Sequence, residues 1–404
     1  MSPAEYPFLP AWPPAVTPLA WVAVLLLLAI VAGEATRHWL RVSRVIGYLL
    51  AGAVLGPHAV GVLDADTLAT LRIFSDIAVG LLLFELGQRV DLGWLRRNPW
   101  LLVTSVLEAL LTLVAVFAVM RLFDVRAVTA AAAGVLAIAT SPAVVITLVK
   151  DLRAQGQVTE RVMLFTALNT TYAVVGLALI FGWLHFESAR ASTMIFAHPL
   201  YLIIGSLVLA ALLAVVMILL LRLFGRKPAF QFAITIALVL LTVAAASELD
   251  LLVPLTLLLL GVFGRIFDRD RHFVSLRFGH SAMLFVVLLF ALAGAGLEFR
   301  GWLAALPMAL GFIAARYLGK LVPVLLFARP SSLTARKASL VQLGLTPMSG
   351  LALLMMQDLA QQAPALAQEI SASMYLAITI LAFAGPVALQ FALNRAGETE
   401  EGEQ

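Results

Sequence analysis

Long apolar runs broken by short polar segments make up almost the whole chain. A helix needs about 20 mostly apolar residues to cross the hydrocarbon core of a membrane. Thirteen runs have roughly that length, and we expect transmembrane helices near 18–36, 45–62, 69–88, 100–121, 128–149, 162–184, 199–222, 229–247, 251–267, 279–297, 303–327, 338–358 and 371–394. The pattern therefore predicts an all-α polytopic membrane protein with about thirteen transmembrane helices.

Two polar strings interrupt the fifth and twelfth of these runs. They are Thr140-Ser141-Pro142 and Thr346-Pro347-Met348-Ser349-Gly350. Proline removes a backbone donor and clashes with the preceding turn, so neither helix continues unbroken. Lipid cannot satisfy the backbone groups that a break frees, so they must line a cavity inside the protein. Two broken helices at corresponding places are typical of a secondary transporter, and we predict that both strings, prolines included, belong to its substrate site.

The distribution of basic residues predicts the orientation in the membrane. Lysine and arginine are enriched in cytoplasmic loops. Of the 27 in the chain, 20 lie in or beside the C-terminal tail and the loops after odd-numbered runs, and five lie in or beside the other loops. We therefore expect a periplasmic N-terminus and a cytoplasmic C-terminus.

The thirteen runs divide into two units of six, with run seven as a connector. We place the first repeat, the linker helix and the second repeat at 18–184, 199–222 and 229–394. The single connector inverts the second unit relative to the first, which makes an inverted-topology repeat whose two broken helices cross. These parts form one transmembrane domain at 18–394, between an expected periplasmic tail at 1–17 and an acidic cytoplasmic tail at 395–404.

Composition supports membrane insertion and excludes several classes of protein. Hydrophobic residues make up 62% of the chain and the mean hydropathy is +1.01, so apolar residues outnumber the positions that a soluble core could bury. No cysteine is present and no histidine pair has a metal-ligand spacing, so we expect no metal site and no cofactor. The net charge of +4 is modest and follows the loops, so nucleic acid is not an expected partner.

Four charged residues stand out inside the predicted spans, where burying a charge is costly. Arg316 and Lys320 lie four apart on one face of span eleven, and Glu108 and Glu85 are carboxylates at a suitable depth in spans four and three. Two interpretations remain open. Either these groups couple transport to charge, or Arg316 and Glu108 form a permanent brace while Glu85 and Lys320 extend to the membrane surface.

A polar run near the middle of span six consists of Asn169, Thr170 and Thr171. Alone, such side chains commonly bond to neighbouring helices. Their place directly after broken span five favours a binding role instead. Further uncharged oxygen ligands for a monovalent cation are expected in the broken helices, at Thr140, Ser141, Thr346 and Ser349.

Five segments carry a resemblance to a known family: VIGYLLAGAVLGPHAVGVL at 45–63, GLLLFELGQRVDLGWLRR at 80–97, AIATSPAVVITLVKDL at 137–152, ARYLGKL at 315–321 and AGPVALQFALNRAG at 384–397. They resemble the sodium/hydrogen exchanger-like monovalent cation:proton antiporters, especially the bacterial branch of potassium-efflux systems. The resemblance implies a homodimer with a scaffold domain from spans one to three and eight to ten. It also implies a core domain from spans four to six and eleven to thirteen that moves in an elevator-like alternation.

The resemblance assigns roles to particular residues, and the chain departs from it at one. The two polar strings would be the crossed unwound stretches, and Arg316 or Lys320 the basic residue of the core. Family members carry an aspartate in span six, where alignment places Thr170-Thr171, or Asn169-Thr170 in a shifted frame. A threonine cannot release a proton near neutral pH, so another acid must do so if exchange occurs.

Two functions follow from this departure. The first is a Na+ or K+:proton antiporter of the bacterial inner membrane, with Glu108 or Glu85 as the displaced acid. The alternative is a relative without proton coupling, acting as a uniporter, a carrier of a neutral or anionic solute, or a membrane sensor. We do not expect an enzyme, because no histidine or aspartate at membrane depth would activate Ser349 as a nucleophile.

Overall fold

The computed structural model describes residues 18–40, 42–57, 59–63, 65–90, 92–189, 194–224, 228–268, 280–297 and 302–399. Within these residues the chain is helical, with no strand, which confirms the all-α prediction. The helices are α1 (Pro18–Leu40), α2 (Arg44–Leu55), α3 (Ala65–Arg89), α4 (Leu92–Arg97), α5 (Pro99–Leu122), α6 (Ala127–Ile138), α7 (Pro142–Asp151), α8 (Gln157–Ala189), α9 (Met194–Phe224), α10 (Pro228–Glu248), α11 (Val253–Phe267), α12 (His280–Ala295), α13 (Trp302–Leu326), α14 (Ala335–Gly344), α15 (Gly350–Gln362) and α16 (Pro364–Ala396).

The predicted spans correspond closely to these elements. Each apolar run overlaps one helix or, for the fifth and twelfth runs, a pair of short helices. Among the described residues, eight segments are long and apolar enough to cross a membrane, and α2, α11 and α12 contain shorter apolar stretches. The multi-pass architecture is thus confirmed, and the count of thirteen spans stays a prediction.

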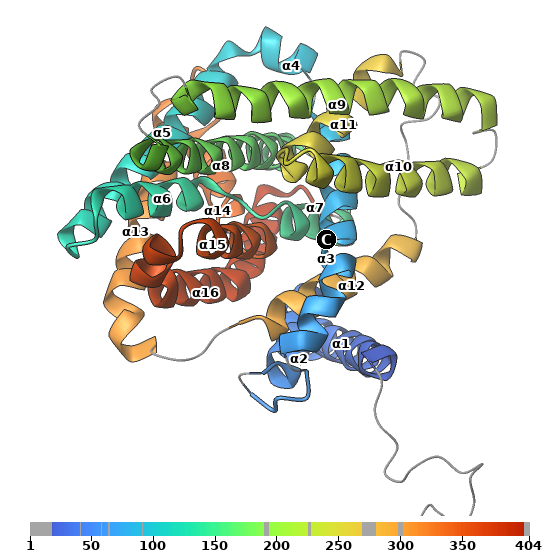
Figure 1. Ribbon diagram of the computed structural model, residues 1–404, viewed down its shortest axis with the longest axis horizontal. Coiled ribbons are helices and arrows are strands. Elements are labelled where there is room, and N and C mark those ends of the chain that lie inside the picture. The colour runs from blue at the N-terminus through green and yellow to red at the C-terminus, as the bar shows by residue number, and fades with distance from the viewer. Residues whose placement is uncertain are drawn as a thin grey trace, which may run out of the picture.

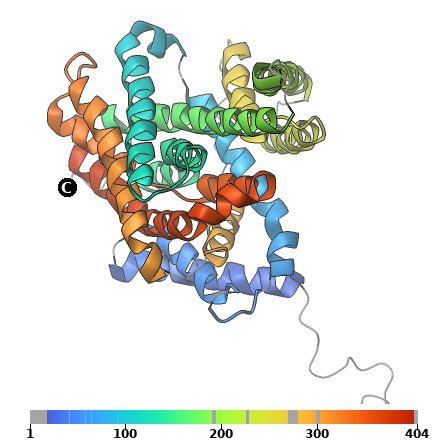
Figure 2. The same cartoon turned by 60° about the vertical axis from the view of Figure 1, so that its left-hand side comes forward.

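The helices gather around two apolar cores. Figure 1 shows α6, α13, α15 and α16 on one side of the molecule, and Figure 2 shows α5 running beside α13. These helices share a core that includes Leu136, Phe312 and Met356. Helices α1, α2, α3, α11 and α12 contribute to a second core, which includes Phe84 and Phe290.

Both broken helices occur where the sequence predicts them. Pro142 begins α7 at its first turn, where a missing amide hydrogen costs nothing, and the Ser141 side chain caps that helix by accepting from the Val144 amide at 3.4 Å. In the second break, residues 346–349 separate α14 from α15. The two breaks touch, because the Ser141 amide donates to the Pro347 carbonyl at 2.9 Å. This contact brings together residues that lie about 200 positions apart in the chain.

Glycines permit two especially close helix pairs. An added Cβ at Gly52 of α2 would lie 1.8 Å from the Ala291 carbonyl oxygen of α12, and one at Gly294 would lie 2.1 Å from that of Leu49. The pair α3 and α11 repeats the pattern at Gly87 and Gly261. Any side chain at these positions would push the backbones apart. Such matching pairs are what the predicted inverted repeat would produce, and that repeat stays a prediction.

The end of α16 is fastened to the start of α8. Gly397 closes α16 in a left-handed conformation, with φ of 68°. The Glu398 carboxylate then accepts hydrogen bonds from the amides of Val158 and Thr159 at 2.9 and 2.8 Å. A carboxylate at a helix N-terminus satisfies free donors and interacts favourably with the helix dipole. The acidic tail therefore begins as a cap on α8.

Candidate functional site

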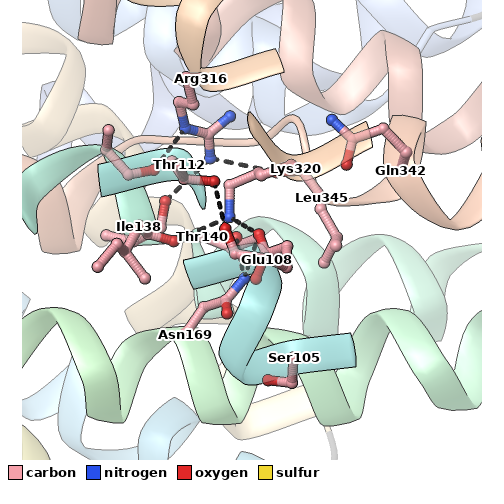
Figure 3. Close-up of polar contacts among 12 residues, drawn as sticks. Ser105, Glu108, Thr112, Ile138, Thr140, Asn169, Arg316, Lys320, Gln342 and Leu345 are labelled. Atoms are coloured by element: carbon pink, nitrogen blue, oxygen red, sulfur yellow. Dashed lines mark hydrogen bonds and ion pairs between the residues drawn. The ribbon is translucent and has the colours of Figure 1, made fainter. Parts of the chain in front are cut away.

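The candidate site lies where the two broken helices meet the middle of α13. Arg316 and Lys320 project from one face of that helix, one turn apart, and are 2% and 0% exposed. Figure 3 shows both side chains pointing into a cluster of polar groups from α5, α6, α8 and α14. The sequence prediction that this face carries buried basic groups is met by the structure.

Arg316 binds only backbone carbonyls among its hydrogen bonds in the described residues. Its guanidinium donates at 2.9 to 3.1 Å to four carbonyls at the ends of the broken helices: Ala137, Ala139, Leu345 and Thr346. The last carbonyls of a helix have no partner within it and carry partial negative charge. Arg316 thus satisfies the ends of α6 and α14 together. The predicted brace between Arg316 and Glu108 was wrong, because no ion pair joins these two side chains in the described residues.

The carboxylate of Glu108 pairs instead with Lys320. The Lys320 ammonium donates to Oε1 of Glu108 and, at 3.0 Å, to the carbonyl of Ile138. Both side chains are completely buried. The interpretation that Lys320 extends to the membrane surface was therefore also wrong. Oε2 of Glu108 is buried without a hydrogen-bond partner in the described part of the chain.

Asn169 completes the polar cluster from the side of α8. Its amide nitrogen donates to Oε1 of Glu108 at 3.2 Å and to the hydroxyl of Thr140 at 3.4 Å. Its amide oxygen is buried and, among the described residues, has no partner. On α5, the Thr112 hydroxyl donates to the Glu108 carbonyl at 2.6 Å and does not reach the carboxylate. Asn169 and Thr140, both predicted as ligands, thus lie beside the ion pair.

The remaining predicted ligands lie close by but point elsewhere. The hydroxyls of Thr170 and Thr171 donate to the carbonyls of Thr166 and Ala167 one turn earlier in α8. Ser141 and Ser349 bond to each other through their hydroxyls at 2.7 Å, which links the two broken helices. The Thr346 hydroxyl is buried and has no partner within the described residues. The prolines act through the backbone, since the Pro347 carbonyl accepts the Ser141 amide.

Glu85 does not join this cluster through any contact in the described residues. It lies on α3, where Oε1 accepts from Arg89 at 3.2 Å and Oε2 from Lys150 at 2.5 Å. At 6% exposure it does not extend to the surface either. The predicted charge-coupling set therefore divides into three residues at the crossing, Glu108, Arg316 and Lys320, and Glu85, which pairs with Lys150 at the end of α7.

Sequence reasoning predicted free backbone groups at the breaks but did not identify which residues supply them. The carbonyls of Ala137, Ile138, Ala139 and Leu345 are ligands for the two buried cations, although their side chains carry no polar group. The signal was present in the proline strings, because a helix that breaks must leave free carbonyls just before the break. Whether Arg316 or Lys320 bonds to a given carbonyl depends on how the helices cross. The local sequence does not encode that crossing.

The arrangement offers oxygen ligands of the kind that bind cations. The Lys320 ammonium contacts the Glu108 carboxylate and the Ile138 carbonyl, and the Asn169 amide nitrogen bonds to the same carboxylate and to the Thr140 hydroxyl. Carboxylate, carbonyl and hydroxyl oxygens are the ligands that hard cations prefer. Two buried acceptors, Oε2 of Glu108 and Oδ1 of Asn169, retain unused lone pairs. A carboxylate and a titratable amine in contact, away from water, provide both a cation ligand and a proton donor.

Comparison with known proteins places these observations in context. A family model described as "Sodium/hydrogen exchanger, transmembrane" matches residues 23–395. No curated protein sequence matches the chain. Two solved structures of the sodium proton antiporter MjNhaP1 from Methanocaldococcus jannaschii are similar in fold. The structure at pH 8 has 18% identity and a TM-score of 0.67, and the match covers 96% of this chain and 97% of that one. The structure from electron microscopy has 16% identity and a TM-score of 0.71, and the match covers 95% of this chain and 98% of that one.

Proposed function

The chain belongs to the sodium/hydrogen exchanger family, a family of membrane transporters, and from that premise we propose that it exchanges a monovalent cation, Na+ or K+, for a proton. In this proposal Glu108 binds the cation and Lys320 carries the proton. The contact between the buried ammonium and carboxylate is the observation that supports it. No aspartate is needed in span six, where the chain has Thr170 and Thr171.

The two bound states differ in which cation faces Glu108. In the first, the protonated Lys320 ammonium is the partner of the carboxylate. In the second, Na+ or K+ takes that position, the N–H bond of the ammonium breaks, and the proton leaves to water while Lys320 stays as a neutral amine. Each cycle moves one positive charge in each direction. Competition for a single carboxylate keeps the two cations from binding together, as exchange requires.

Arg316 has a different role in this scheme. Two helix C-termini, each equivalent to about half a negative charge, face its guanidinium. Their sum offsets the single charge of Arg316. The remaining pair, Glu108 and Lys320, is neutral as well, so the core offers an anion no net attraction. We propose that Arg316 stays protonated and holds the crossing together while Lys320 titrates.

The family resemblance supplies the larger frame of the proposal. We propose a homodimer in a bacterial inner membrane, with the N-terminus periplasmic and the C-terminus cytoplasmic. The core domain, α5 to α8 and α13 to α16, would move against the helices α1 to α3 and α10 to α12 in an elevator-like alternation. One apolar core is built mainly from α5, α6, α8, α13, α15 and α16, which supports grouping these helices together.

Flux measurements in proteoliposomes test the proposal. With a pH gradient imposed, Na+ or K+ should drive proton movement and chloride should not. Glu108→Gln and Lys320→Met should each reduce that exchange to background. Glu369→Gln serves as a matched control, because this carboxylate pairs with Arg126 outside the cluster. The control should exchange as the wild type does.

Three outcomes would contradict the proposal in different ways. Exchange that survives both Glu108→Gln and Lys320→Met would remove the assigned site. Cation flux without proton movement would favour the uniporter, the alternative that the absence of a span-six aspartate supports. Flux driven by chloride would indicate an anion carrier.

A further inference from the structure

Two residues of opposite charge end the half-helix α7. Helix α7 starts beside the crossing point at Ser141 and, ten residues later, ends with Lys150 and Asp151. It spans about 15 Å at the usual rise per residue. Its apolar side chains, including Val144 and Ile146, pack in the core shared with α2 and α3. Any movement of the crossing relative to those helices must therefore change what the end of α7 touches.

Lys150 contacts a buried carboxylate on α3. Its ammonium lies 2.5 Å from Oε2 of Glu85, whose side chain is 7% exposed. Oε1 of Glu85 accepts from Arg89 of the same helix at 3.2 Å. Separating α7 from α3 would remove one of the two cations facing this carboxylate. A buried carboxylate that loses a partner is destabilised, so the contact favours the arrangement described here.

Asp151 makes a second ion pair, in which α7 supplies the negative partner and α2 the positive one. Its carboxylate lies 3.9 Å from Nη1 of Arg44, the first residue of α2. Nε of Arg44 lies 2.8 Å from Glu34 of α1. Arg44 therefore stands between carboxylates of α1 and α7. Together, the last two residues of α7 reach two helices, α3 and α2, through ion pairs of opposite polarity, and Arg44 of α2 also pairs with α1.

A polar cavity of about 570 Å³ lies beside the Asp151 contact. Its lining includes Glu34, Arg37, His38, Arg44, Asp151 and Gln390, from α1, α2, α7 and α16. Water in such a cavity screens the neighbouring charges, so the Asp151 pair is weak and can break and reform readily. Apolar packing alone would not give a contact that is both specific in position and easily released.

We infer that Lys150 and Asp151 form an electrostatic latch that holds α7 against α2 and α3 in the described state and opens during transport. The inference rests on the proposed function in one respect, the movement of the core. In this inference Glu85, predicted from sequence as a charge-coupling group, controls the movement of the core domain and does not bind the transported ion.

Thiol labelling measures the latch without any transport assay. The chain has no cysteine, so Ala143→Cys introduces a single reporter. Ala143 is 6% exposed and borders a gap of about 10 Å³ against α3 and α12, large enough for one water molecule. A water-soluble maleimide should label this cysteine slowly. Adding Lys150→Gln with Asp151→Asn should raise the labelling rate by about fivefold, the size expected for one coupled contact.

Matched variants distinguish the latch from a general loss of stability. Asp151→Asn alone, which changes only the weaker pair, should give a smaller increase, and Lys150→Arg should keep the slow rate. The pair Arg126→Gln with Glu369→Gln removes an ion pair between the start of α6 and α16, and should leave labelling unchanged. Labelling that stays slow in the double variant, or rises equally in the control pair, would overturn the inference.

A cross-link tests whether the contact must open. Glu85→Cys with Lys150→Cys, joined by a reducible bifunctional thiol reagent, should lose cation-driven proton movement and regain it on reduction. Full transport by the cross-linked protein would make the contact a fixed brace. If labelling responds as expected while the wild type moves no protons, the latch stands and the proposed exchange function fails.

Discussion

At the scale of single residues, the pair of Glu108 and Lys320 is the most consequential feature of the chain. Both side chains are completely buried, and each is the main counter-charge of the other. Removing one partner of a buried pair leaves an uncompensated charge, which typically costs about 3 to 5 kcal/mol. Replacing both by apolar groups of similar size is often close to neutral.

This asymmetry gives a stability prediction. Glu108→Gln should lower the free energy of unfolding by about 3 kcal/mol, because the Lys320 ammonium loses its carboxylate. Combining Glu108→Gln with Lys320→Met should recover most of that loss. Thermal and denaturant unfolding in detergent, analysed as a double-mutant cycle, measures the coupling. Additive effects of the two changes would show that the side chains are not energetically paired.

At the scale of elements, Arg316 joins the ends of the two half-helices α6 and α14, whereas Lys320 bonds to a carbonyl of α6 alone. Its planar fork reaches carbonyls of α6 through Nε and Nη2, and of α14 through Nη1 and Nη2. A lysine offers three donors from one nitrogen and cannot span both helix ends in this way. The side chain thus acts as a geometric connector and not only as a charge.

The role of Arg316 predicts a graded response to substitution. Arg316→Met should cost about 3 kcal/mol or more, since four carbonyls lose charged donors. Arg316→Lys should lie between Arg316→Met and the wild type. Hydrogen exchange should quicken around residues 136–141 and 343–349 in both variants. Equal stability of the lysine variant and the wild type would mean that charge alone matters.

At the scale of the whole molecule, the basic residues predict how the helices enter the membrane. The 20 to 5 division of lysine and arginine predicts that the two ends lie on opposite sides of the membrane, and hence an odd number of crossings. A reporter fused after Gln404 should be cytoplasmic, and a tag at Met1 should be accessible from the periplasm. Protease protection or reporter activity in intact cells measures on which side of the membrane each end lies. Finding both ends on one side would rule out thirteen spans.

Much of the architecture was readable from local sequence. Apolar runs located the helices, with ends that differ by up to seven residues at α2 and α16, because a membrane span must be long and apolar whatever surrounds it. Proline strings gave both breaks, because proline disrupts a helix through its own ring. The buried charges were recognisable for the same reason, since an ionised group at membrane depth is unusual in any context.

The sequence by itself thus determined the class of protein, the approximate helices, the two breaks and which charged residues are buried. Tertiary structure decided the pairing: Glu108 with Lys320, Arg316 with four carbonyls, and Glu85 with Lys150. Helical position and burial cost are local properties, so the sequence encodes them within a few residues. A partner of a charge is set by how separate helices cross, and a shift of one turn along α13 exchanges Arg316 for Lys320.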